Sequence, residues 1–340
     1  MKAEIACVAA ARVTPMKLSA FVSLVLIALL PLPAAAEHLR FVKRIGPGWD
    51  DWGWMSTVAF SPDGRRIASD ALANPKDKVG GWTTIWSFPD GRLLKRLPGE
   101  PIAISRDWKY YGDQKQIRAM KDGAPVAWKP ERAFETLAFG PGRIVAAQDL
   151  DAEGPAIRVS DRVTGKLLAA FGQNQVFSLA VSPDGRTLAA GYWDEVALWD
   201  IRSGKRIGML RGIGRYVVNL SFSPDGRRLA SATDFGTLQI WDVRRRVRLH
   251  EVDFEGGEVS EAAFSPDGRL AAAGVYGTGA VFLVDVRSGK ILDQKKVSDS
   301  GCGSAAFSPD GRYLITPSTG GLITWPYDRG GTIRVFRVVK

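Results

Sequence analysis

The side chains that could carry acid–base or metal chemistry are few in this chain. Its 340 residues include only two histidines, His38 and His250, and two cysteines, Cys7 and Cys302. That supply is too small for a histidine-based metal site or a serine–histidine pair. The sequence also has no nucleophile elbow, P-loop or Rossmann glycine pattern. We therefore predict no cofactor, no metal and no catalytic residue, and we expect the protein not to be an enzyme.

Two groups of carboxylates deserve comparison with known chemistry. Asp149, Asp151 and Glu153 alternate as in part of a calcium loop, but the later ligands are missing, which favours a solvated loop. Asp50 and Asp51 lie side by side, and paired carboxylates serve glycoside hydrolases. Adjacent acids in a loop are more often simply polar, so hydrolysis stays the minor alternative.

The two adjacent aspartates belong to an aromatic stretch, GPGWDDWGW, at residues 46–54. Its glycines disfavour a helix or a plain strand, and its three tryptophans offer a large apolar area. Large rings with polar edges are typical of binding surfaces. The alternative is that Trp52 or Trp54 folds inward and packs between neighbouring structural units.

A repeated pentapeptide shows which elements must position these residues. Ser-Pro-Asp-Gly-Arg begins at five places, and the last four copies are 41 to 43 residues apart: Ser61, Ser182, Ser223, Ser265 and Ser308. The longer gap after Ser61 has room for two altered copies, which occur at residues 101–107 and 137–143. The chain therefore contains seven units.

Each unit reads as four antiparallel strands. Proline, aspartate and glycine of the repeat favour a tight turn between the first two strands. The third strand ends in Trp-Asp or a weaker form, and a Gly-Lys turn opens the fourth. Seven such sheets in series predict an all-β, seven-bladed β-propeller over residues 37–340. The seventh unit lacks its last strand, and the alternating segment 38–45 should supply it and close the ring.

The units resemble WD repeats, with the signature dipeptide at Trp199-Asp200 and Trp241-Asp242. The resemblance covers residues 38–340 and implies a scaffold that binds partners. The Gly-His pair of that family is absent here, so its buried Asp–His–Ser/Thr–Trp network is not expected. Tol-type periplasmic propellers also carry Ser-Pro-Asp-Gly, and we identify the chain as an exported bacterial type by that resemblance.

Residues 1–36 predict a cleaved signal peptide. Lys17 precedes the apolar run 18–30, and Ala34 to Ala36 match a signal peptidase site. Met1 and Met16 are alternative starts. The expected location is periplasmic or secreted. Cleavage leaves Cys302 alone, so no internal disulfide forms, and this thiol is expected to be a small buried apolar group.

The strand count separates the two faces of the disc. One face should carry the loops between second and third strands and the links between blades. We predict that this face binds a partner through eleven residues: Trp49, Asp50, Asp51, Trp52, Trp193, Arg215, Tyr216, Phe235, Tyr276, Trp325 and Tyr327. Turn chemistry is the favoured explanation of the Asp and Arg residues repeated on the opposite face, and the alternative is a ring of basic residues that contacts acidic partners.

The expected partner is a protein, with a glycan as the alternative, and the propeller is expected to be a monomer. Solubility is the favoured explanation of the net charge of +10, and the alternative is attraction to envelope glycans, anionic lipids or acidic proteins. No nucleic-acid partner is predicted. The alternative function is a propeller enzyme, either a hydrolase or lactonase or a quinone-dependent dehydrogenase. Thr164-Gly165-Lys166 resembles a quinoprotein turn, but Leu167 follows where that family has tryptophan.

Overall fold

The computed structural model describes residues 37–46, 55, 57–71, 81–113, 115–126, 136–142, 144–148, 156–172, 175–299, 301–318 and 332–339. Residues 37–340 form one compact unit. All the regular elements described in this unit are β-strands. Within the described ranges, no helix has the length and hydrophobicity needed to span a membrane.

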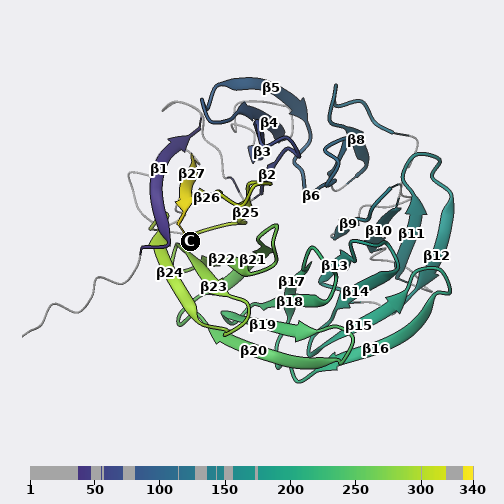
Figure 1. Ribbon diagram of the computed structural model, residues 1–340. Coiled ribbons are helices and arrows are strands. Elements are labelled where there is room, and N and C mark those ends of the chain that lie inside the picture. The colour runs from purple at the N-terminus through teal and green to yellow at the C-terminus, as the bar shows by residue number, and fades with distance from the viewer. Residues whose placement is uncertain are drawn as a thin grey trace, which may run out of the picture. The chain divides into compact units, whose positions relative to one another are not determined.

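Seven antiparallel sheets follow one another around a ring, as the sequence predicts (Figure 1). The first blade contains β2 (Val58–Phe60), β3 (Arg66–Ala71), β4 (Trp82–Ser87) and β5 (Leu93–Pro98). The second contains β6 (Ala103–Ile104), β7 (Tyr110–Gly112) and β8 (Ile117–Ala119). The third contains β9 (Leu137–Phe139), β10 (Ile144–Gln148), β11 (Ile157–Asp161) and β12 (Leu167–Phe171). The second blade shows three strands in the described residues, and the segment 127–135, where its fourth is expected, lies outside them.

The remaining blades each have four strands. The fourth blade contains β13 (Ser178–Val181), β14 (Thr187–Gly191), β15 (Glu195–Asp200) and β16 (Lys205–Arg211), and the fifth contains β17 (Val217–Phe222), β18 (Arg228–Thr233), β19 (Thr237–Asp242) and β20 (Val247–Asp253). The sixth contains β21 (Glu258–Phe264), β22 (Leu270–Tyr276), β23 (Ala280–Asp285) and β24 (Ile291–Lys296). The seventh contains β25 (Ala306–Phe307), β26 (Tyr313–Ser318), β27 (Thr332–Val338) and β1 (Leu39–Ile45). The first strand of each blade lies innermost (Figure 1).

The N-terminal strand closes the ring. β1 pairs antiparallel with β27, from Leu39 opposite Val338 to Ile45 opposite Ile333. The predicted closure is therefore confirmed. Leu39 is fully buried, and its backbone N–H donates a 2.7 Å hydrogen bond to the Asp293 carboxylate of the sixth blade. The first strand thus connects the seventh blade to the sixth.

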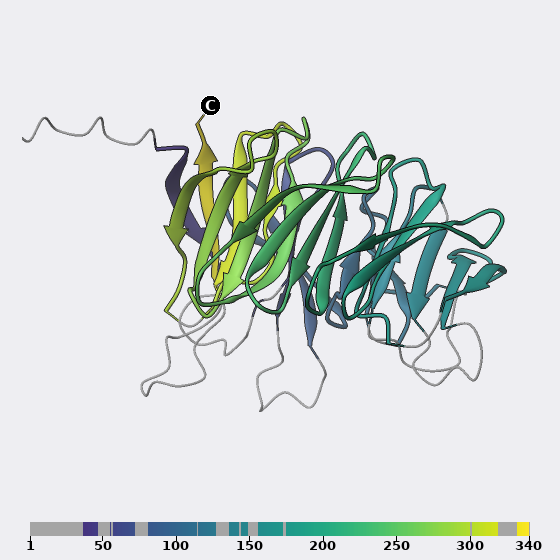
Figure 2. The same ribbon diagram turned by 90° about the horizontal axis from the view of Figure 1, so that it is seen from below.

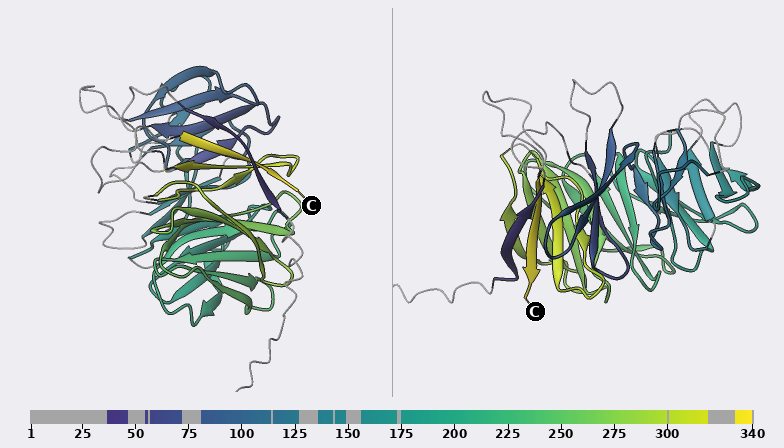
Figure 3. Two further views of the ribbon diagram at one scale, coloured as in Figure 1. Left: turned by 90° about the vertical axis from the view of Figure 1, so that its left-hand side faces the viewer. Right: turned by 90° about the horizontal axis from the view of Figure 1, so that it is seen from above.

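The hairpin turns of each blade lie together on one face, which we call the turn face. The turn after β15 starts with Ile201, and its backbone N–H donates a 2.9 Å hydrogen bond to the carbonyl of Arg186, which lies in the turn before β14. Val243 and Arg227 make the equivalent bond at 3.0 Å in the fifth blade. The other face, the loop face, carries the second-to-third loops and the links between blades. Figures 2 and 3 show the strands running between these two edges.

The repeated turn also links neighbouring blades. In the fifth blade, Ser223 Oγ donates to Asp225 Oδ1 at 2.6 Å, and the Arg227 N–H donates to the same oxygen at 3.1 Å. The hydrogen bond from Ser223 is the main cause that lowers the pKa of Asp225. Gly226 has φ +71°, and a Cβ there would lie 3.5 Å from Pro183 of the fourth blade. The hydrogen bonds of the turn explain the repeated aspartate, whereas the arginine contributes its backbone N–H to them.

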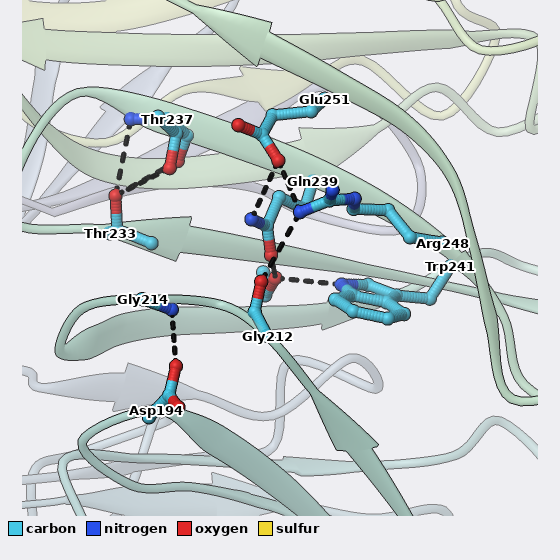
Figure 4. Close-up of polar contacts among 10 residues, drawn as sticks. Asp194, Gly212, Gly214, Thr233, Thr237, Gln239, Trp241, Arg248 and Glu251 are labelled. Atoms are coloured by element: carbon cyan, nitrogen blue, oxygen red, sulfur yellow. Dashed lines mark hydrogen bonds and ion pairs between the residues drawn. The ribbon is translucent and has the colours of Figure 1, made fainter.

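The buried Asp–His–Ser/Thr–Trp network was not expected from the sequence, yet two of the third-strand tryptophans form its Ser–Trp hydrogen bond. Trp241 Nε1 donates to Ser231 Oγ at 2.9 Å, without any histidine (Figure 4). Trp86 donates in the same way to Ser69 at 3.1 Å. Trp199 occupies the matching register, but its buried Nε1 has no hydrogen-bond partner among the described residues.

A buried arginine joins the second and third blades. The Arg162 side chain is only 3% exposed, and it contacts Asp107 of the second blade at 3.0 Å. Its guanidinium lies 4.7 Å from the ring centroid of Tyr110. Position 106 holds arginine where five other turns have proline, so this seam uses an ion pair and a stacked cation in place of the usual Pro–Gly contact.

Cys302 is fully buried, as the sequence predicts. Its Sγ lies 2.9 Å from Thr316 Oγ1. Burial raises the pKa of the thiol to about 12, so this group remains protonated near neutral pH.

Candidate binding surface

Five of the predicted binding residues fall in described parts of the loop face, and four of them lie in two groups of contacting side chains. Trp193 comes from the loop after β14, and Tyr216 from the link before β17. Their ring centroids are 3.8 Å apart with the planes at 76°. Phe177, from the link before β13, also contacts Tyr216, with ring centroids 4.7 Å apart. Both pairs are T-shaped, and the distance between Phe177 and Tyr216 lies in the range that is favourable for aromatic rings.

The second group pairs a cation with a ring. The Arg215 guanidinium lies 3.7 Å from the ring centroid of Phe235, which comes from the loop after β18. Arg215 and Tyr216 are consecutive, so this pair adjoins the first group. We call the set Phe177, Trp193, Arg215, Tyr216 and Phe235 the loop-face aromatic surface. It extends over the fourth and fifth blades.

Backbone hydrogen bonds hold these segments against one another. The Val217 N–H donates to the Tyr192 carbonyl at 3.1 Å, which joins the link to the fourth-blade loop. The Asp234 N–H donates to the Tyr216 carbonyl at 3.3 Å, which joins it to the fifth-blade loop. The Asp194 carboxylate accepts a short hydrogen bond from the N–H of Gly214 (Figure 4). Three segments far apart in sequence therefore form one ordered platform.

The aromatic side chains remain accessible despite these contacts. Trp193 is 53% exposed and Phe235 is 60% exposed, and Phe177 is also exposed. Large apolar side chains grouped on a surface mark interaction sites more often than single exposed ones do. The surface has the composition of a binding hot spot, with tryptophan, tyrosine and arginine together.

Carboxylates border the surface on the side of the sixth blade. Burial raises the pKa of Glu258, and the negative charge of Asp234 adds to that rise. One oxygen of Asp234 is buried and has no hydrogen-bond partner among the described residues. These acids would favour a partner that brings a hydrogen-bond donor or a cation next to the rings.

The fifth described residue, Tyr276, does not join the aromatic groups. It ends β22 opposite Glu258 of β21, and its side chain is 36% exposed. No ring contact connects Tyr276 to the other described aromatics. It lies on the predicted face, at the acidic border of the surface.

The other predicted residues lie outside the described residues: Trp49, Asp50, Asp51, Trp52, Trp325 and Tyr327. Their part in binding stays a prediction. Sequence reasoning missed Phe177, although it occupies the link before the fourth blade just as Tyr216 occupies the link before the fifth. Counting every aromatic residue in those links would have found it.

The described residues offer little chemistry of other kinds. No group of three or more His, Cys, Asp or Glu residues in these ranges could hold a metal ion. Glu261, on the innermost strand β21, is the most perturbed carboxyl group, since burial raises its pKa to about 7 and a hydrogen bond with Ser304 opposes the rise. Burial and Ser304 are the influences on its pKa, and no described carboxylate contributes to the shift as the partner in a hydrolytic pair would.

The architecture defines the class of protein first: a seven-bladed β-propeller with an accessible aromatic surface on its loop face. The family described as "WD domain, G-beta repeat" matches residues 165–200 and 204–242, two consecutive repeats. The fold and these repeats support a WD-repeat β-propeller protein. Proteins with such repeats act as non-catalytic scaffolds for protein interactions.

Several curated proteins are similar to parts of the chain. Periodic tryptophan protein 2 of Arabidopsis thaliana is 27% identical over 53% of this chain and 21% of its own length. The WD repeat-containing protein SL1-17 of Schistosoma mansoni is 29% identical over 44% of the chain and 40% of its own. The small ribosomal subunit protein RACK1 of Caenorhabditis elegans is 28% identical over 42% and 35%. The matched segments span two fifths or less of these relatives.

Proposed function

We propose that this protein is a non-catalytic scaffold that binds a protein partner through the loop-face aromatic surface, and that it does so in the envelope of a bacterium. The observation that carries the proposal is the continuous group of Trp193, Tyr216 and Phe177 beside Arg215 and Phe235. These side chains are ordered by contacts with one another and still expose large apolar area.

Preorganisation is what makes this surface suited to binding. The rings are held by edge-to-face contacts and by the backbone bonds between their loops, so little side-chain entropy remains to be lost on association. Exposed tryptophan and phenylalanine then supply apolar area to be buried. A partner with apolar residues flanked by a basic group would match both the rings and the acidic border.

The cellular setting of the proposal rests on the signal-like pattern in residues 1–36 and on the resemblance to exported propellers. A protein partner is favoured over a glycan because the repeats are of the protein-binding type and because one similar protein is named as a ribosomal subunit component. The partner of this chain would be a protein of the compartment in which the propeller resides.

Site-specific crosslinking in the native cell tests the proposal. A photoreactive amino acid replaces Trp193, and the matched control replaces Leu94 on the outer strand β5, because both side chains are 53% exposed. The expected result is one defined, protease-sensitive adduct at position 193 that is absent at position 94. An adduct that resists protease but is cleaved by glycosidase would show that the partner is a glycan and not a protein. If the same adducts formed at positions 193 and 94, the proposal that the loop-face aromatic surface binds the partner would be refuted.

A variant pair separates binding from stability. With the photoreactive amino acid moved to Tyr276, at the border of the surface, Trp193→Ala and Phe235→Ala should each weaken binding of the partner by about 30-fold or more, the effect of losing roughly 2 kcal/mol at a hot spot. Both side chains are more than half exposed, so the thermal midpoint should change little. A marked fall in the midpoint with intact binding would mean that the rings serve packing instead.

A further inference from the structure

The outer hairpin turns of the fourth, fifth and sixth blades carry an unusual density of cations on the turn face. Eight exposed cations there form no ion pair with another described residue: Arg202, Lys205, Arg206, Arg244, Arg245, Arg246, Arg287 and Lys290. Arg248, at the edge of the same group, pairs with Glu251 (Figure 4). Solubility does not require like charges to be concentrated in one place.

The acids of these turns are already engaged by the turns themselves. Asp200 accepts hydrogen bonds from the N–H and the hydroxyl of Ser203, at 2.7 and 2.6 Å. Asp285 is bonded in the same way by Ser288, at 2.7 and 2.7 Å. Asp242 accepts from the N–H of Arg245 at 2.7 Å. The carboxylates therefore satisfy the turn backbone, while the cationic side chains remain exposed.

The three turns form one surface because the outer edges of the blades touch. A Cβ at Gly208 of β16 would lie 2.5 Å from Nε of Arg246, so the arginine of the fifth blade lies across the fourth. His250 Nε2 of β20 lies 2.8 Å from the Arg287 carbonyl of the sixth blade. Figure 1 shows β16, β20 and β24 following one another around the outside of the ring.

Exposed aliphatic side chains lie among the cations. Ile207, Val247, Leu249 and Ile291 each follow one of these turns and are between 37% and 46% exposed. No phenylalanine, tyrosine or tryptophan occurs in segments 202–207, 244–249 or 287–291. We call these three segments the outer-turn patch. Cations interleaved with aliphatic groups are typical of surfaces that lie on a lipid interface.

We propose that the outer-turn patch binds the anionic surface of a phospholipid bilayer. Arginine and lysine are attracted to acidic headgroups, and the neighbouring aliphatic groups can enter the boundary between headgroups and acyl chains. A single-stranded nucleic acid would use the same charge, but it is normally held by aromatic stacking as well, which this patch does not offer. Docking by the turn face would leave the loop-face aromatic surface turned away from the lipid.

Vesicle sedimentation tests this proposal with the protein as it is recovered from the expressing cell. The probes are vesicles of phosphatidylcholine alone and of phosphatidylcholine with phosphatidylglycerol. We expect binding to require phosphatidylglycerol and to weaken as salt is raised. Because each cation contributes about five-fold to affinity, Arg244→Gln with Arg245→Gln should weaken binding by roughly 25-fold.

A matched control removes the same charge from the opposite side. Arg44→Gln with Arg158→Gln, at the loop-face ends of β1 and β11, should leave vesicle binding within about two-fold of the unaltered protein, and both of these arginines are exposed like those of the patch. Val247→Ser with Leu249→Ser should weaken binding at constant charge. The unaltered protein and all the variants have the same N-terminus, so a difference in vesicle binding among them is caused by the substituted side chains.

Three results would overturn the proposal. Equal binding to both vesicle compositions would exclude recognition of anionic lipid. Equal losses in the two double-charge variants would show a general charge effect. The third result would be that the variant with Arg244→Gln and Arg245→Gln no longer binds a single-stranded oligonucleotide but still binds vesicles as the unaltered protein does. That outcome would show that the patch binds nucleic acid. The inference is independent of the proposed scaffold role, since Trp193→Ala should leave vesicle binding unchanged.

Discussion

The third-strand tryptophans allow the value of one buried hydrogen bond to be measured in three settings within one molecule. Trp241 depends on Ser231, whose side chain is completely buried. Ser231→Ala removes the acceptor and leaves an indole N–H without a partner inside the fifth blade. An unsatisfied buried donor costs about 1–3 kcal/mol, so we expect a loss of about 2 kcal/mol in the free energy of unfolding.

The other two blades provide the comparison. In the first blade, Trp86 also lies 3.2 Å from Thr84 Oγ1, so Ser69→Ala leaves an alternative acceptor and should cost about 1 kcal/mol or less. In the fourth blade, Ala190 holds the position that corresponds to Ser231, and Trp199 Nε1 lacks a described partner. Ala190→Ser should supply that acceptor and raise the stability by about 1 kcal/mol.

Thermal and denaturant unfolding of the three variants give the test. A change of 2 kcal/mol corresponds to a shift of roughly 4 °C in the midpoint for a domain of this size. The expected order of midpoints is Ala190→Ser highest, then the unaltered protein, then Ser69→Ala, and Ser231→Ala lowest. If Ser231→Ala were neutral while Ala190→Ser destabilised, the hydrogen bond would have no share in the stability of the blades, and the reasoning would be refuted.

Two further predictions concern buried charge. Arg162→Met should lower the unfolding free energy by roughly 2 kcal/mol, because the contact between the second and third blades loses the ion pair with Asp107 and the contact with Tyr110. Asp107→Asn should cost more, about 3 kcal/mol, because it leaves the buried Arg162 guanidinium without its counter-ion, whereas Arg162→Met leaves a carboxylate that is partly exposed to water. Equal effects of the two variants in urea unfolding would contradict this. The pKa of Glu261 is raised to about 7 in the folded protein from an ordinary value of 4.5. The contribution of this group to the free energy of unfolding is therefore fully present below about pH 4.5, and about 3 kcal/mol of it is lost as the pH rises from there to about 7. Glu261→Gln should flatten this dependence between pH 5 and 8, and an unchanged pH profile of the midpoint would show that the carboxyl group is solvated.

The sequence predicted the fold because its signals are local or periodic. Each Ser-Pro-Asp-Gly turn closes through bonds between residues two to five apart, such as Ser223 to Asp225, so neighbouring residues suffice to specify it. The repeat period then fixed the number of blades, and the missing last strand required a closing strand at the other end of the chain. Pairing of β1 with β27 followed from counting alone.

The candidate surface was predicted only in part. Strand counting assigned Trp193, Arg215, Tyr216 and Phe235 to the loop face, since the direction of each strand decides where its loops lie. It could not show that Phe177 completes the aromatic group, or that Tyr276 stays apart from it. Those outcomes depend on side-chain rotamers and on how successive blades are rotated against one another.

The contact between the second and third blades and the outer-turn patch also show which features local sequence specifies and which depend on tertiary structure. By itself the sequence determined the turns, the strands, the seven-fold repeat and the closure of the ring, because short-range bonding and periodicity encode them. Only the tertiary structure decided that Arg162 would lie buried between two blades and that the cations of three separate turns would join in one patch. Those contacts connect residues about 40 or more positions apart, and their geometry is set by how whole sheets pack.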